Sequence, residues 1–336
     1  MPRVDEIGEF GLIERIKARR TGYEEEVVVG IGDDGAVLRR GPILEVLTTD
    51  CLLEGSHYEA GWLSMEDIGW KALAVNVSDI AAMGGIPKHA LVTLFLPEDF
   101  TTKRVDQIYD GLEQCGDAFG VAVVGGDIVR TPGAFAISVA LSGICERDQL
   151  VLRSGARAGD TIVVSGALGE ASVGLRWLKE GRPAEGDALT ACVRRFQRPT
   201  PRLNESRTIV LELQPSSMID LSDGLLSDLW HVLDASKAGA TVEGDRLPVG
   251  QGVVDFFKGN KAEALSQALS GGEDYELLFT INSKLEEQLP EIAAKTGVRL
   301  TPIGKITAKG TGVKLAGAGG ERALGRGGFD HFKRRT

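Results

Sequence analysis

Short apolar, β-branched runs that stop at aspartate constrain this chain more than any other feature. Four runs share the pattern: 27–31 before Asp33 and Asp34, 43–49 before Asp50, 121–126 before Asp127, and 217–219 before Asp220. Runs of this length and composition predict strands. A folded interior tolerates a carboxylate only when it is solvated, paired or bound to a cation. We therefore expect several carboxylates to gather on one edge of a sheet and bind hard cations.

The order of the predicted elements favours an α/β fold with mixed sheets. In the first half, helices are predicted at 9–16, 64–83 and 101–120, and further strands at 89–96 and 134–145. In the second half, strands are predicted at 160–166, 275–281 and 298–306, helices at 171–178, 189–196, 202–213, 226–233 and 285–295, and a glycine-rich passage at 310–328. This order does not match a pure Rossmann repeat. A length of 336 residues favours two domains, which we place at 1–149 and 150–336.

Charge and hydropathy exclude several kinds of partner. The net charge is −10 and the sequence has no basic face, so a nucleic acid is not expected. No apolar span approaches the roughly 20 residues that cross a bilayer, so we expect no membrane segment and a cytoplasmic protein. Four widely spaced cysteines, with no CxxC pair, are expected to be buried free thiols.

The aspartates fit a site for several magnesium ions. Magnesium prefers oxygen ligands and completes its shell with water and phosphate. The candidate ligands are Asp33 or Asp34, Thr48, Thr49, Asp50, Asp79, Asp127, Asp220 and Asp223. The alternative is that each aspartate only forms a turn or caps a helix, as aspartate often does after a strand.

Other residues suit phosphate binding. Gly125-Gly126 would let main-chain amides approach phosphate oxygens. The chain has no GxxxxGK[ST] motif, and Gly30 to Gly35 lacks the third glycine of a dinucleotide fingerprint. Cations and arginine must therefore hold the phosphates, and Arg153 offers a guanidinium near the boundary between the halves. His57 follows Asp50 closely enough to line the same pocket.

Taken together, the motifs resemble thiamine-monophosphate kinase over nearly the whole chain. They are Gly32-Asp33-Asp34, Thr48-Thr49-Asp50, 75–84, Gly125-Gly126-Asp127, 220–225, 270–277 and 329–332. The resemblance implies transfer of the ATP γ-phosphoryl group to thiamine monophosphate, the last step of thiamine diphosphate biosynthesis. It also implies a two-domain aminoimidazole ribonucleotide synthetase-like fold and a homodimer in which the N-terminal domains pair their sheets.

The resemblance further implies roles for single residues. Asp34, Thr48, Thr49, Asp50, Asp79, Asp127, Asp220 and Asp223 are similar to magnesium ligands. Gly126, Asp127, Arg153 and Ser222 are similar to ATP contacts, and His57, Glu273 and Phe329 to contacts of the thiamine substrate. Asp50, Asp127 and Arg153 are the expected catalytic residues. Because the acceptor is already an ionised phosphate, direct in-line transfer needs no general base.

Two kinds of alternative remain. One is another enzyme of the same superfamily. Selenophosphate synthetase is disfavoured because its reactive cysteine is expected earlier in the chain than Cys51. Hydrogenase-maturation relatives are disfavoured because they end in a reactive cysteine, whereas this sequence ends in Lys333-Arg334-Arg335-Thr336. An aminoimidazole ribonucleotide synthetase stays possible. The other alternative is a non-catalytic sensor that binds nucleotide or divalent cations through its carboxylates.

Overall fold

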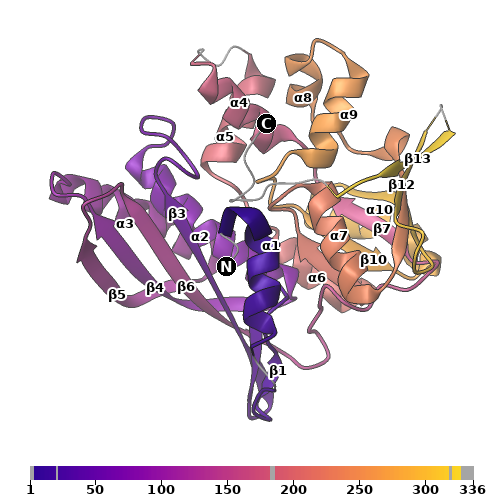
Figure 1. The fold of residues 1–336 in the computed structure, drawn as a ribbon, viewed down its shortest axis with the longest axis horizontal. Coiled ribbons are helices and arrows are strands. Elements are labelled where there is room, and N and C mark those ends of the chain that lie inside the picture. Colours follow the sequence, from indigo (N-terminus) through magenta and orange to yellow (C-terminus); the bar gives the residue numbers. More distant parts are fainter. Residues whose placement is uncertain (1–3, 20–21, 182–185, 318–319, 327–336) are drawn as a thin grey trace.

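Two mixed sheets organise the chain, one in each half (Figure 1). The computed structural model describes residues 4–19, 22–181, 186–317 and 320–326. The strands of the first sheet are β1 Val27–Val29, β2 Ala36–Arg40, β3 Ile43–Leu53, β4 Ile86–Leu96, β5 Ala122–Arg130 and β6 Ala136–Cys145. Their order is β1-β2-β3-β6-β4-β5, and only β4 and β5 pair in parallel.

Two helices cover one face of this sheet, α2 (Met65–Ala82) and α3 (Thr102–Phe119). Both were predicted, and both begin where a side-chain oxygen accepts a backbone N–H: Ser64 caps α2 and Thr101 caps α3. Gly120 ends α3 in the left-handed conformation, with φ 71°. Apolar side chains of α2, α3 and the inner sheet face share one core cluster.

The second sheet contains seven strands in the order β13-β12-β9-β11-β7-β10-β8. They are β7 Thr161–Ser165, β8 Ser217–Asp220, β9 Gly239–Glu243, β10 Leu277–Ile281, β11 Leu300–Thr307, β12 Val313–Gly317 and β13 Gly320–Leu324. The helices of this half are α4 Glu170–Lys179, α5 Asp187–Gln197, α6 Leu203–Leu213, α7 Leu225–Ser236, α8 Gln251–Phe256, α9 Lys261–Ser270 and α10 Leu289–Thr296. Short 3-10 turns lie at Gly244–Arg246 and Ser283–Gln288.

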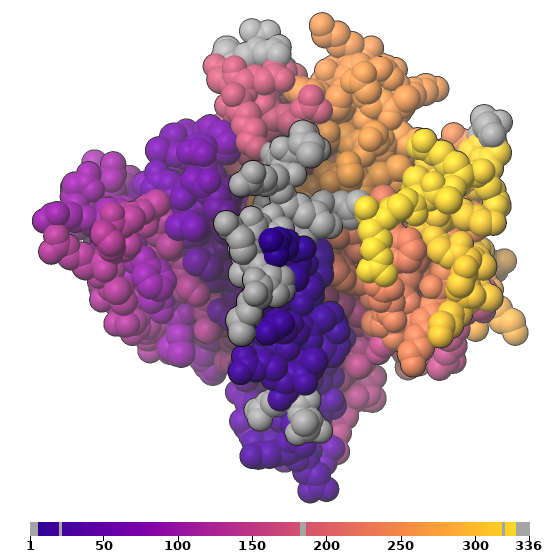
Figure 2. Space-filling view, in the orientation of Figure 1, coloured from indigo at the N-terminus to yellow at the C-terminus, as the bar shows by residue number. Residues whose placement is uncertain are grey.

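The two halves meet along α2 and along the N-terminal helix α1 (Val4–Lys17). Helix α2 contacts β3 on one side and β8 and α6 on the other. Figure 2 shows α1, in indigo, across the front of the molecule between the purple and orange halves. Phe10 of α1 lies 4.8 Å from the ring of His231 on α7. Both halves therefore contribute residues to the region along α2.

The structure corrects three predictions of local structure. Asp50 and Asp127 lie within β3 and β5, not at their ends, because backbone pairing continues past both residues. The glycine-rich passage contains the antiparallel pair β12 and β13. The predicted helix at 285–295 starts as a 3-10 turn. No helix among the described residues combines the length and apolarity needed to cross a bilayer.

Candidate active site

Three carboxylates from separate elements meet between the two halves. Asp34 lies in the loop after β1, Asp79 on α2 and Asp220 at the end of β8, and one oxygen of each lies within 4.8 Å of the others. Asp34 and Asp220 are buried, at 8% and 2% exposure. The predicted convergence of aspartates is therefore found for these three. It occurs between two sheets and a helix, not on one edge of one sheet.

Neighbouring groups hold the three carboxylates in place. Thr48 donates to Asp79 Oδ2 at 2.5 Å, and Ser78 donates to Asp220 Oδ2 at 2.6 Å. Arg153 places its guanidinium 2.5 Å from Asp34 Oδ1. Asp34 Oδ2 is buried and has no hydrogen-bond partner in the described part of the chain. An unpartnered buried carboxylate oxygen is costly unless a cation balances it.

Burial and mutual repulsion raise the pKa values of the acidic groups. Desolvation is the main cause for Asp220, whose pKa rises to about 7, with the Asp34 charge adding to it. The pKa of Asp79 lies well above its usual range because of burial and the nearby Asp50 and Asp220 charges. Burial and the Asp34 charge also raise the pKa of Asp33 to about 7. The carboxylates thus repel one another near neutral pH unless cations are bound.

This repulsion predicts a pH-dependent effect of replacing Asp220. The pKa of Asp220 is about 7 in the folded state, against the ordinary value of 3.8. Between these two pH values, the folded state therefore binds more protons than the unfolded state. The contribution of Asp220 to stability then decreases as pH rises. Without divalent cations, the melting-temperature gain of Asp220→Asn over the wild type should therefore grow from about pH 5 to about pH 8. A pH-independent difference in thermal unfolding would contradict this.

The alternation of β3 decides which of its side chains reach the cluster. Asp50 pairs with Val139 and Thr48 with Leu141, which are both buried on the helix-covered face. The charge of Asp50 acts on both Asp79 and Asp220. Thr49 lies on the opposite face, where its hydroxyl donates to the Val139 carbonyl. The structure thus brings Thr48 and Asp50 to the cluster, but not the side chain of Thr49.

Asp127 is not part of this cluster within one protomer. Asp50 pairs with Val139 on β6, which pairs with Val92 on β4, which pairs with Gly126 on β5. Asp50 and Gly126 are thus three strand spacings apart, or about 14 Å. Asp127 itself pairs with Thr93, so its side chain is on the outer face of the sheet, where it is exposed. Gly126 is required by packing, because an added Cβ would lie 1.8 Å from the Val92 oxygen.

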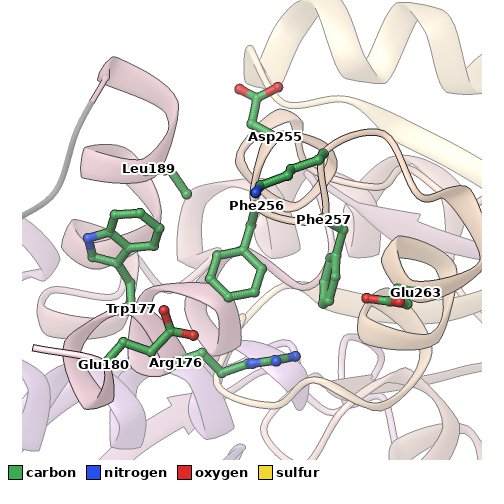
Figure 3. A pocket seen from close by; sticks show the side chains of 9 residues that line it. Arg176, Trp177, Glu180, Leu189, Asp255, Phe256, Phe257 and Glu263 are labelled. Atoms are coloured by element: carbon green, nitrogen blue, oxygen red, sulfur yellow. The ribbon is translucent and has the colours of Figure 1, made fainter. Parts of the chain in front are cut away.

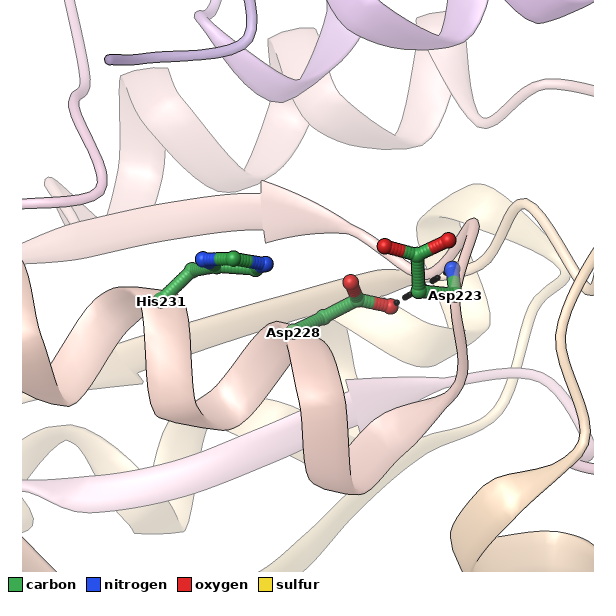
Figure 4. A group of neighbouring side chains, drawn as sticks. All are labelled: Asp223, Asp228 and His231. Atoms are coloured by element: carbon green, nitrogen blue, oxygen red, sulfur yellow. Dashed lines mark hydrogen bonds between the residues drawn. The ribbon is translucent and has the colours of Figure 1, made fainter. Parts of the chain in front are cut away.

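Asp223 and Ser222 form a turn directly after Asp220. The buried carboxylate of Asp228 on α7 accepts the backbone N–H groups of Asp223 and Gly224 at 3.2 and 3.1 Å. Figure 4 shows Asp223, Asp228 and His231 side by side, with oxygen and nitrogen ligand atoms within 4.8 Å of one another. Burial lowers the pKa of His231 to about 4. A neutral imidazole therefore lies beside the carboxylates of Asp223 and Asp228.

The three predicted substrate contacts lie in different parts of the chain. The Glu273 backbone N–H donates to the Ser222 oxygen at 2.7 Å, so Glu273 adjoins the Asp223 turn. His57 lies in the turn after β3, where its Nδ1 accepts the Leu53 N–H at 3.0 Å. Phe329 lies outside the described residues. Ser78 and Lys71 were not predicted as site residues, although a lysine within an apolar helical run is a visible signal in the sequence.

A cavity of about 490 Å³ lies elsewhere, among α4, α5, α8 and α9 (Figure 3). Phe256 and Phe257 form an aromatic wall of this cavity, and the guanidinium of Arg176 lies 5.0 and 5.2 Å from their ring centres. None of the predicted site residues that the structure describes lines this cavity. The acidic cluster therefore remains the candidate active site.

Comparisons with known proteins identify the family of this chain. The family model of the AIR synthase related protein N-terminal domain matches residues 32–145, and that of the C-terminal domain matches 157–315. Thiamine-monophosphate kinase of Bacillus subtilis (strain 168) is 33% identical over 97% of this chain and 99% of the relative. That of Escherichia coli (strain K12) is 36% identical over 97% and 98%.

Solved structures give the same result. "AaThiL complexed with AMPPCP and TMP" is 34% identical, with a TM-score of 0.87 over 98% of this chain and 99% of that one. The hydrogenase maturation protein HypE in complex with ATP is 19% identical, with a TM-score of 0.68 over 86% of each chain, and shares the fold alone. The two matched domains and the full-length identity show that this chain belongs to the thiamine-monophosphate kinase family.

Proposed function

We propose that this protein transfers the γ-phosphoryl group of ATP to thiamine monophosphate in the cytoplasm, giving thiamine diphosphate and ADP. The observation that carries the proposal is the buried cluster of Asp34, Asp79 and Asp220 between the two halves. Such a cluster suits cations that hold two phosphate groups together. The likeness to a structure complexed with AMPPCP and TMP supports this pair of substrates.

The residues present fit magnesium. The donor set consists of oxygens, and Asp34 Oδ2 is buried without a hydrogen-bond partner among the described residues. The side chains that would hold the ions are Asp34, Thr48, Asp50, Asp79, Asp220 and Asp223. Bound magnesium would neutralise charge on the phosphate oxygens and so reduce repulsion between donor and acceptor.

The protein's own groups suit direct in-line transfer. Arg153 is 22% exposed beside Asp34, so its guanidinium can also contact a phosphate at the cluster. The Ser222–Asp223 turn is fixed by Asp228 and the Glu273 backbone, and this limits its motion when ATP binds. The acceptor phosphate is already ionised at neutral pH. The proposed reaction therefore needs no general base and no phosphoenzyme.

An assay of the purified chain with ATP, magnesium and thiamine monophosphate tests this function. We expect ADP and thiamine diphosphate in equal amounts, and no product when free thiamine replaces the monophosphate. Formylglycinamidine ribonucleotide tests the synthetase alternative. ATP binding without turnover of either acceptor would instead support the sensor alternative.

We further propose a homodimer in which Asp127 acts on the partner's site. Asp127 is exposed on the outer face of the first sheet, about 14 Å from the strand that carries Asp50. The same face exposes Leu53 and Leu91, at 40% and 52%, and Val129 at 37%. Packing this face against a second copy would bury these apolar side chains and provide Asp127 and Gly126 in trans.

A further inference from the structure

Lys71 is a lysine buried inside a helix whose neighbours are mostly apolar. It lies on α2, is 1% exposed, and is followed by Ala72 and Leu73, which belong to the core. Burying an ammonium group is unfavourable unless hydrogen bonds and an opposite charge compensate. Lys71 therefore needs both kinds of partner inside the protein.

Three groups from the second half surround the Lys71 ammonium. Nζ donates to the Phe196 carbonyl at 2.8 Å and to Glu273 Oε2 at 3.0 Å. It also lies 3.7 Å from the centre of the Phe196 ring, a cation–π distance. The side chain thus crosses from the first half to the second. Its ionic partner there is Glu273, whose own side chain stays 24% exposed.

Glu273 belongs to a loop whose backbone is constrained. Its φ is +67° and that of Tyr275 is +49°, a region that non-glycine residues adopt at a cost. The Glu273 N–H donates to Ser222 O and the Tyr275 N–H to Leu221 O. Asp274 accepts the N–H groups of Gly169 and Ala171. This backbone fixes where the Glu273 side chain begins, while Lys71 fixes where its carboxylate lies.

Helix α2 also carries residues of the acidic cluster and its surroundings. Ser78 and Asp79 follow Lys71 by seven and eight residues, and Ser78 donates to Asp220. Eight helical residues span about 12 Å along the axis. One rigid helix therefore sets the spacing between the Glu273 carboxylate and the acidic cluster. A substrate with a phosphate at one end and a nitrogen heterocycle at the other is extended enough to contact both.

We propose that Lys71 is a positioning residue for the acceptor: it holds Glu273 at a fixed distance from the acidic cluster, so that the carboxylate receives the heterocyclic end of a phosphorylated substrate. The proposal rests on the function proposed above. Among the described residues, the contacts of Lys71 Nζ are with Phe196 and Glu273, and not with Arg153 or Ser222 on the proposed ATP side. Lys71 should therefore affect acceptor binding selectively.

Steady-state kinetics of Lys71→Met, Glu273→Gln and the double variant test this. We expect each single variant to raise KM for thiamine monophosphate about 10-fold or more, the usual effect of losing a hydrogen bond to a charged group. KM for ATP and kcat should change less than about threefold. The KM of the double variant for thiamine monophosphate should be no higher than that of the more affected single variant, because both substitutions remove the same interaction.

Val253→Ala is the matched control for lost stability, since Val253 is fully buried in a separate cluster with Val173 and Cys192. It should lower the melting temperature and leave both KM values unchanged. An unchanged KM for thiamine monophosphate in Lys71→Met, an equal rise in KM for ATP, or additive effects in the double variant would each overturn the proposal. Glu273 is only half-buried, so Glu273→Gln should fold even if Lys71→Met does not. This variant alone then still tests the proposal. A wild type inactive on thiamine monophosphate would refute the proposed function instead.

Discussion

Replacing Asp50 with asparagine should lower kcat about 1,000-fold at saturating magnesium. Asp50 lies on the inner face of β3, and its charge acts on Asp79 and Asp220. In the proposed reaction, a carboxylate there would help to hold the cations that balance two phosphate groups. Loss of one preorganised electrostatic contact typically costs 10²- to 10³-fold, or about 3–4 kcal/mol of transition-state stabilisation.

Thermal unfolding separates this catalytic loss from misfolding. Asp50 raises the pKa values of Asp79 and Asp220, so it repels them in the metal-free protein. Asp50→Asn should therefore melt at the same or a higher temperature than the wild type without divalent cations. Asp110→Asn, on the exposed face of α3, serves as a matched control and should keep wild-type kcat. Near wild-type turnover of Asp50→Asn would refute the assignment.

Local sequence signals predicted most of the elements. Helices were predicted to start at Ser64 and Thr101, and the side chain of each residue accepts a backbone N–H of the first helical turn. Asp220 was predicted at the end of a strand, and β8 ends there. These features depend on a few neighbouring residues, which a sequence displays directly. The antiparallel pair β12 and β13 was missed because glycines obscure the strand pattern.

Long-range placement could not be predicted in the same way. Asp50 and Asp127 follow similar apolar runs, yet the strand register puts their side chains on opposite faces of one sheet. That register depends on which strands pair, and β6 and β4 separate the two residues. Lys71 was missed for a related reason. Its partners Phe196 and Glu273 are 125 and 202 residues away.

The position of Asp127 leads to a second large effect, in mixed dimers. Asp50→Asn and Asp127→Asn chains should each be inactive alone. Co-expressed with different tags and purified through both, they should give dimers with about half the wild-type activity. If Asp127 acts across the dimer, one site combines an intact Asp50 with an intact Asp127 and the other has neither. If Asp127 acts within its own chain, both sites of every mixed dimer are damaged and the activity stays near zero.

The reciprocal mixture makes the test independent of how well the tags work. A chain carrying both substitutions, paired with a wild-type chain, should be nearly inactive under action in trans, because the intact Asp50 then faces the substituted position 127 of its partner. Action in cis predicts about half activity for the same mixture. The two mixtures contain the same four residues at the two positions and differ only in their distribution between chains. Opposite activities in the two mixtures therefore report the geometry of the site, and not the number of substitutions.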